Sequence, residues 1–303
     1  MKKLFSIKKD YINARLDRWI KRNVCNIPQS LIEKDIRKGK IKVNNKKEKS
    51  SYKLKIDDKI ELFNFNYAED KNKKIKYKYV PTKRDLSYSS SLFIENNENF
   101  AVINKPSGIS VQSGTKSIRN IIDILRNTKE FQGYFPYPVH RIDKETTGVL
   151  LVAKNRKYAQ LLTSLFRIRK IHKIYLGIIL GQPEVNKGTF IDILFHYEGA
   201  KKIETKAITD YEVIDSSKNY TLIKLIPKTG RKHQLRKQLF IRNHPIFGDS
   251  KYSDPKKKIK EKNNFMLHAY KISFSINDIE YNFSAEPPLN FRNLLKKKYL
   301  KIF

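Results

Sequence analysis

A run of six small or apolar residues, Gly148-Val-Leu-Leu-Val-Ala153, limits the folds open to this chain. An apolar run of this length without alternation is typical of a strand buried within a sheet. We therefore predict a central strand over residues 148–153. The charged segment that leads into it, residues 139–147, is then attached to a rigid core, which favours a functional loop over an ordinary surface loop.

Asp143 is the residue of this loop best suited to chemistry. Its carboxylate can act as a nucleophile or as a general base. An aspartate that only caps the turn fits the same spacing, so the local pattern leaves both interpretations open.

The rest of the C-terminal two-thirds alternates between short strand patterns and irregularly spaced helices. Many neighbouring strands with few helices predict an α+β fold rather than a doubly wound α/β fold. The expected strands cover 100–103, 171–180, 207–214, 220–227, 267–275 and 279–285, and the expected helices cover 118–127, 158–169, 233–241 and 291–299.

Residues 12–62 form a separate small unit in this interpretation. The spacing of Leu16, Trp19 and Ile20 predicts a short helix, and a second helix lies between Pro28 and Gly39, residues suited to a helix start and a helix end. Short strands are expected over 40–43, 52–56 and 60–62. We expect residues 1–11 to be an N-terminal tail, residues 63–90 a basic and serine-rich linker, and residues 91–303 a second domain.

The second helix of the N-terminal unit has a basic side, formed by Lys34, Arg37, Lys38 and Lys40. Two helices and a small sheet with such a side are compatible with an RNA-binding module. A pair of amphipathic helices with a solvated polar face is the alternative.

The chain carries 64 Lys and Arg against 30 Asp and Glu, a formal net charge of +34. Such a surplus favours a polyanionic partner, with nucleic acid first and an anionic membrane surface second. A genome rich in A and T also produces many Lys, Asn and Ile codons without selection for binding. The basic runs 71–78 and 256–262 are open to the same two interpretations, RNA contact or solvation alone.

Several function classes lack their motifs in this sequence. The single cysteine, Cys25, excludes an intrachain disulfide and a thiolate metal cluster. Neither a P-loop nor a G-x-G-x-x-G loop is present, and the six histidines show no metal-binding spacing. We therefore expect no metal and no organic cofactor. No apolar run is long enough to span a membrane and the N-terminus has no apolar signal core, so we expect a cytoplasmic protein without a membrane partner.

A second polar cluster lies in residues 227–239. The three- and four-residue spacing of His233, Arg236 and Phe240 places them on one helix face, and Leu235 and Leu239 form a separate apolar row. Arg236 can therefore face a site rather than water. Arginine presents a planar fork to a carboxylate or phosphate, which lysine does not.

Four motifs, in order along the chain, resemble those of the RluA family of pseudouridine synthases. They are Asn104-Lys-Pro-Ser-Gly108, His140-Arg-Ile-Asp-Lys-Glu-Thr-Thr-Gly148, Ile171-His-Lys-Ile-Tyr175, and Gly230-Arg-Lys-His-Gln-Leu-Arg236 together with His244-Pro-Ile-Phe-Gly-Asp249. Weaker blocks at 204–209 and 267–269 extend the resemblance over roughly residues 92–290. The N-terminal unit is similar to an S4 (αL-type) RNA-binding domain, and its segments 14–19, 27–32 and 37–44 resemble the RluC branch of the family most closely.

The resemblance implies an isomerisation of uridine in RNA to pseudouridine, in a domain built on a mixed, mainly antiparallel sheet. The C1′–N1 bond breaks, the uracil turns, and C5 bonds to C1′. Asp143 matches the nucleophile of the family, Arg236 the arginine that pairs with it, and Tyr175 the tyrosine that stacks on the base and assists proton removal from C5. The residue pattern alone favours an ordinary sheet-packing role for Tyr175.

The target base must leave the RNA stack to reach Asp143. By resemblance, Arg141 fills the space that the base vacates. The implied contacts to RNA, or residues that shape the site, are His140, Arg141, Arg231 and His233.

Two other functions stay open at this point. A non-catalytic RNA-binding or ribosome-assembly protein would share the S4 unit and the charge without needing Asp143, Tyr175 and Arg236 together. A hydrolase using Asp143 and Glu145 is weaker, because these residues lie only two apart in the chain and no second placed acid supports them. Within the favoured function we expect 23S ribosomal RNA as substrate, with tRNA as the alternative, and a monomer.

Overall fold

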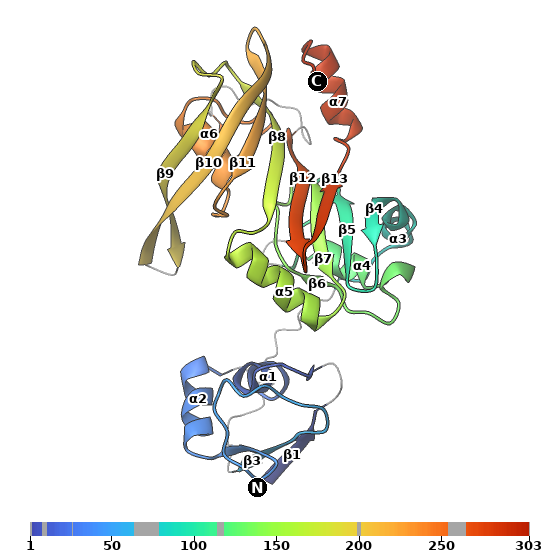
Figure 1. Cartoon of the computed structure of the whole chain (residues 1–303), viewed down its shortest axis with the longest axis vertical. Helices are drawn as coiled ribbons and strands as arrows, with labels where there is room; N and C mark the ends of the chain where they lie inside the picture. Colours follow the sequence, from blue (N-terminus) through green and yellow to red (C-terminus); the bar gives the residue numbers. More distant parts are fainter. Residues whose placement is uncertain are drawn as a thin grey trace. The chain divides into compact units, whose positions relative to one another are not determined.

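The computed structural model describes residues 2–7, 11–25, 27–63, 79–113, 118–198, 201–253 and 265–302. The chain divides into two compact units, Met1–Tyr77 and Lys78–Phe303 (Figure 1). The basic runs 71–78 and 256–262 lie outside the described residues. No helix in the described ranges is both long and apolar enough to cross a membrane.

The first unit packs two helices on a three-stranded antiparallel sheet. Helices α1 (Leu16–Asn23) and α2 (Gln29–Arg37) fall where the sequence predicts them. The strands run in the order β1 (Lys2–Ser6), β3 (Lys59–Phe63) and β2 (Ile41–Val43). The unit has its own hydrophobic core.

Two expectations for this unit are wrong. Residues 2–6, expected in a tail, pair with β3, because Phe5 packs on Trp19 at a ring distance of 5.7 Å and Ile7 enters the core. Residues 52–56, expected as a strand, make only an isolated bridge between Lys53 and Arg15. Their alternation arises because Leu54 is buried in the core.

Part of the expected linker also folds. Helix α3 (Lys83–Ser89) begins with a capping box, in which the Thr82 hydroxyl accepts from the backbone of Asp85 and the Asp85 carboxylate accepts from the backbone of Thr82. The hydroxyls of Ser87 and Ser89 donate to carbonyls three residues earlier, so these polar groups find partners within the helix. A 3-10 turn, η2 (Ser90–Leu92), follows.

The second unit contains a ten-stranded, mainly antiparallel sheet within the described ranges, which confirms the α+β class. Its main path is β4 (Phe93–Asn96), β5 (Phe100–Lys105), β7 (Thr147–Ala153), β12 (Leu267–Ile276), β8 (His172–Leu180), β11 (Tyr220–Pro227), β10 (Lys201–Ser217) and β9 (Lys187–Glu198). Strand β13 (Ile279–Ser284) pairs with β12, and β6 (Tyr137–Pro138) pairs with β7. The parallel neighbours are β7 and β12.

Strand β7 is central, as its apolar run predicts, and every residue in it is buried. Leu150 and Val152 pack in the cluster that contains α4 (Ile121–Leu125). Val149 and Leu151 point the other way, into the cluster that contains α5 (Arg156–Arg167). Burial on both faces fixes the strand and the loop that precedes it. A short 3-10 turn, η3 (Lys129–Phe131), lies between α4 and β6.

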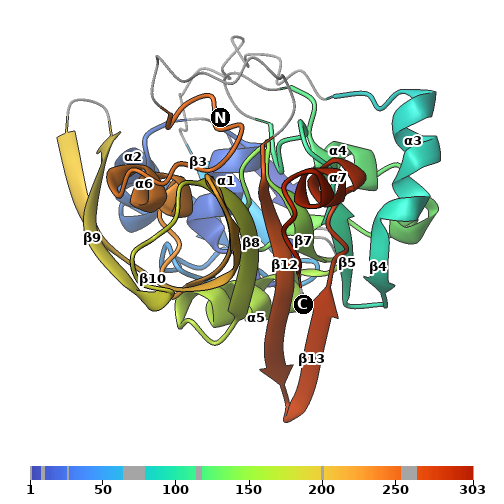
Figure 2. The ribbon, with the colours of Figure 1, turned by 90° about the horizontal axis from the view of Figure 1, so that it is seen from above.

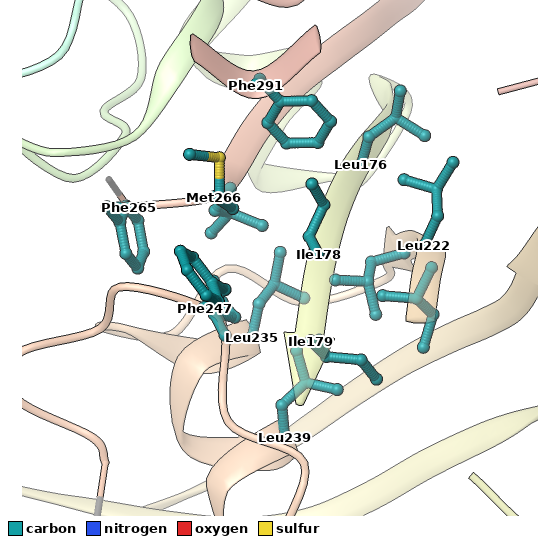
Figure 3. Close-up of a cluster of buried hydrophobic side chains, with 14 of the residues drawn as sticks. Leu176, Ile178, Ile179, Leu222, Leu235, Leu239, Phe247, Phe265, Met266 and Phe291 are labelled. Carbon is teal, nitrogen blue, oxygen red and sulfur yellow. The ribbon is translucent and has the colours of Figure 1, made fainter. Parts of the chain in front are cut away.

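Helix α6 (Gln234–Ile241) lies inside the curve formed by β8, β11, β10 and β9 (Figure 2). Leu235 and Leu239 anchor it in a core shared with Ile178 and Ile179 of β8 (Figure 3). Helix α7 (Leu289–Lys297) adds Phe291 to the same core. With its apolar row buried there, α6 can direct Arg236 elsewhere.

Candidate active site

A pocket of about 850 Å³ opens among the loop before β7, the start of β8 and the N-terminal end of α6. Pockets of this size hold small organic groups such as a nucleoside. The structure brings Asp143, Tyr175 and Arg236 together in its lining, from three elements far apart in the chain. The other predicted site residues of this unit, His140, Arg141, Arg231 and His233, line it too.

Arg236 lies between two aspartates. Its Nη1 donates to Asp143 Oδ2 at 3.1 Å, while its Nε and Nη2 both donate to Asp249, each at 2.7 Å. The pairing with Asp143 that the resemblance implies is therefore present as a single bond, while the planar fork of the guanidinium makes two bonds to Asp249.

Burial strengthens this network. Arg236 is only 8% exposed, and its guanidinium lies over the rings of Tyr252 and Phe265, at 5.1 and 4.9 Å. Asp249 also accepts from the backbone N–H groups of Lys251 and Tyr252, so its position is fixed. Charge pairs interact more strongly in such surroundings than in water.

The loop that carries Asp143 is held by the Asn104–Gly108 motif. The Lys105 ammonium donates to three carbonyl oxygens, of Pro106, Ile109 and Lys144. Ser107 donates to the Glu145 carbonyl, and the backbone N–H of Gly108 donates to the Lys144 carbonyl. Burial lowers the pKa of Lys105 to about 7, opposed by the charges of Glu145 and Asp143.

Tyr175 is half-buried in the pocket wall on β8. Burial, reinforced by the negative charge of Asp143, raises the pKa of its hydroxyl well above the usual 10. The phenol therefore stays protonated at neutral pH. It can stack and donate a hydrogen bond, but it is not a ready phenolate base.

His233 begins α6 in a left-handed conformation, with φ of 53°. Its Nδ1 lies 2.9 Å from the Tyr252 hydroxyl, and its Nε2 lies 3.8 Å from Asp143 Oδ1. Burial lowers the pKa of His233, although the charge of Asp143 acts in the opposite direction. The imidazole is therefore neutral at pH 7 and borders the second oxygen of Asp143.

Comparison with known proteins agrees with this geometry. Residues 99–240 match the family model for RNA pseudouridylate synthases and residues 14–60 match the S4 domain. A ribosomal large subunit pseudouridine synthase C from Buchnera aphidicola is 33% identical and covers 93% of each chain. One from Rickettsia felis is also 33% identical, over 92% of this chain and 95% of its own.

The chain belongs to the RNA pseudouridylate synthase family. It is a pseudouridine synthase, an isomerase that acts on RNA. A solved structure, human RNA pseudouridylate synthase domain containing 4, has the same fold over 71% of this chain and 95% of its own, with a TM-score of 0.60 and 27% identity.

His140 has a structural contact within this pseudouridine synthase that the sequence reasoning did not foresee. Its Nε2 accepts from the backbone N–H of Leu151 at 2.9 Å, and its ring stacks on Phe166. Burial, with the nearby charge of Lys173, lowers its pKa to about 3. The hydrogen bond from β7 to this imidazole holds the start of the loop in place.

Arg141 and Arg231 are exposed at the pocket, and Arg231 donates from Nε to the Lys206 carbonyl. In the S4 unit, Lys34, Arg37 and Lys38 are exposed on and after α2. The Lys40 side chain is also partly exposed, at 41%, and its ammonium lies 3.7 Å from the buried Asp35 carboxylate. All four predicted S4 contacts therefore reach solvent.

Asp249 and Lys105 are the residues of the synthase site that sequence reasoning did not single out. Lys105 lies within the motif Asn104–Gly108, and Asp249 ends the motif His244–Asp249. Their place in these motifs is the sequence signal that could have identified them. The weaker block at 267–269 also has a structural explanation: buried His268 contacts Thr147 at 2.8 Å and the Ala285 carbonyl at 2.9 Å, which ties β12 to β7.

Proposed function

We propose that this pseudouridine synthase isomerises uridines of large-subunit ribosomal RNA, with Asp143 as the nucleophile. The observation that carries the catalytic part is the Asp143 carboxylate held by Arg236 in a nucleoside-sized pocket. The substrate is inferred from the names of the relatives, whose similarity extends over more than nine-tenths of the chain, the S4 unit included.

The pairing with Arg236 fixes the orientation of the Asp143 carboxylate at 3.1 Å. Arg236 occupies Oδ2, so Oδ1 is the oxygen left to act on the nucleotide. Asp249 keeps the guanidinium in place during this step.

The uracil reaches this oxygen by leaving the RNA stack, at a cost of a few kcal/mol. Tyr175 offers a ring on which the flipped base stacks. After C5 bonds to C1′, C5 loses its proton to water and N1 takes one up, so the product has the composition of uridine. The protonated Tyr175 hydroxyl can donate a hydrogen bond to the base during this exchange. Arg141, exposed at the pocket, fills the space left in the RNA, and Arg231 and His233 shape the entrance.

The alternatives fit the site less well. A hydrolase needs a second acid, but the Glu145 carboxylate faces the Ser107 hydroxyl at 3.4 Å and is not part of the pocket lining. A purely RNA-binding protein has no need for a buried Arg236 placed between two aspartates. One copy of the chain supplies every residue of the site, which supports action as a monomer.

The experiment is to incubate the purified protein with unmodified ribosomal RNA and, separately, with unmodified tRNA. Carbodiimide labelling followed by reverse transcription maps pseudouridine, and mass spectrometry reports cleavage or base loss. We expect new carbodiimide stops in the large-subunit RNA with no change of RNA mass. Stops confined to tRNA contradict the substrate, and a change of mass contradicts isomerisation.

A further inference from the structure

The pocket has a second group of basic side chains, which the site described above does not use. Four of them line it where α5 gives way to β8: Arg167 at the end of the helix, Arg169 in the turn, and His172 and Lys173 at the start of the strand. We call these four residues the α5–β8 basic turn. They come from a different element than Lys228, Arg231 and Lys232, which line the pocket from the segment before α6.

Arg169 has an unusual backbone for its residue type. Its φ is 61°, in the left-handed region that favours glycine and asparagine. Only four described residues with positive φ are neither Gly, Asn nor Asp, and two of them, Arg169 and His233, line this pocket. Residues held in a disfavoured conformation gather at functional sites.

The conformation at Arg169 closes helix α5. The backbone N–H of Arg169 donates to the Phe166 carbonyl, and that of Lys170 donates to the Leu165 carbonyl. Glycine would make the same two bonds without steric cost. The helix end therefore explains the left-handed turn, but it does not explain an arginine side chain there.

The basic turn also lacks an internal counter-charge. Among the described residues, no carboxylate forms an ion pair with Arg167, Arg169 or Lys173. Lys173 is half-buried, two residues before Tyr175 on β8 and so on the same side of the strand. Burial lowers its pKa, the cost of a cation held without a partner. An anion that enters the pocket would supply the counter-charge that these side chains lack.

We propose that the α5–β8 basic turn is a phosphate-binding site for the RNA strand that carries the target uridine. This deepens the proposed function and rests on it. Exposed Arg167 and Arg169 contact backbone phosphates at the pocket mouth, while Lys173 contacts the phosphate nearest to the base on Tyr175. Together with Arg231, these residues hold the strand on more than one side of the flipped nucleotide.

Arg169→Gly tests the site, because it removes the guanidinium and gives the backbone its favoured residue. Lys157→Gln is the matched control: it removes one positive charge from an exposed position in the first turn of the same helix, about 15 Å from Arg167 along the axis. Each full-length variant is titrated with fluorescein-labelled oligouridine at several salt concentrations. Thermal unfolding and ribosomal RNA turnover are measured alongside.

For Arg169→Gly we expect the slope of log K against log salt to become shallower by about 0.7, one single-strand phosphate. We expect an unfolding midpoint no lower than that of the wild type. Lys157→Gln should keep the wild-type slope. Arg167→Gln, with an ordinary helical backbone, should reduce the slope by a similar step.

A wild-type slope in both arginine variants overturns the proposal, as does an equal loss in Lys157→Gln, which would indicate bulk charge. A lowered unfolding midpoint in Arg169→Gly with an unchanged slope assigns Arg169 a structural role and also overturns it. A wild-type protein that forms no pseudouridine counts against the proposed function instead. An active enzyme with an unchanged slope counts against the phosphate site alone.

Discussion

Arg236 organises the proposed active site through its planar shape as much as through its charge. Three of its nitrogen atoms donate to two carboxylates in different directions. A lysine ammonium has no planar fork, so it cannot give Asp249 two parallel bonds and still direct a third donor at Asp143. Asp249 therefore acts as a positioning residue, which aims the guanidinium at Asp143.

We predict that Arg236→Lys is almost as harmful as Arg236→Ala, each lowering kcat at least about tenfold, because a well-placed charged group contributes a few kcal/mol to such a step. RNA affinity, measured by titration, should change much less. Recovery of nearly the full rate with lysine would show that only the charge matters.

We also predict that Asp249→Asn lowers kcat while binding of RNA is kept. The amide keeps the shape but can accept only one of the two bonds from Arg236, so the guanidinium is no longer fixed toward Asp143. Single-turnover assays of the purified variant measure this. A rate equal to that of the wild type would remove Asp249 from the mechanism.

Lys105 gives a pH-dependent prediction. Its pKa falls from 10.5 to about 7 on folding. Between these values the unfolded chain binds more protons than the folded one, so the contribution of Lys105 to stability rises with pH and is smallest below pH 7. In Lys105→Met, urea unfolding should show less gain between pH 7 and 9 than the wild type. An identical pH dependence in both proteins would contradict the shift.

At the scale of elements, local pattern predicted the segments whose apolar residues face a core: β7, β8, β11, β12, α5 and α6 all lie close to their expected ranges. Strand β9 was missed because Ile191, Ile193 and Phe195 are on its exposed side, which obscures the alternation. The carboxylate that holds Arg236 was missed for a different reason. Asp249 meets it only after the chain turns through a loop with no periodic pattern.

The glycine that ends the catalytic motif has an element-level role. Gly148 has φ of 106°, and a Cβ there would lie 2.2 Å from the Ala269 carbonyl oxygen, where β7 and β12 pair. We predict that Gly148→Ala costs about 3 kcal/mol or more, by strain and by separation of the strands.

Gly133→Ala is the control for that prediction, because φ there is 80° but a Cβ meets nothing within 4 Å. It should cost only about 1 kcal/mol. Chemical unfolding of both variants measures the difference. Equal losses would show that backbone strain alone, and not the contact with β12, makes the glycine necessary.

At the scale of the whole molecule, the chain consists of two units with separate hydrophobic cores, and the two units carry different functional residues. Lys34, Arg37 and Lys38 are exposed in the S4 unit, and the proposed catalytic residues all lie in the second unit. We predict that removing residues 1–77 weakens RNA binding and flattens its salt dependence by about 0.7–0.9 per lost phosphate contact, with the catalytic unit still folded. A truncated chain with the full-length salt slope would refute a phosphate role for the S4 unit.

The central claim is that Asp143, held by Arg236, isomerises uridine in RNA. The most direct test compares wild type and Asp143→Asn on the same unmodified large-subunit ribosomal RNA, with RNA affinity measured in parallel and pseudouridine mapped by carbodiimide. We predict pseudouridine with the wild type, none with Asp143→Asn, and affinities within about twofold, since the amide keeps the size of the side chain. Turnover by Asp143→Asn within tenfold of the wild type would contradict the account.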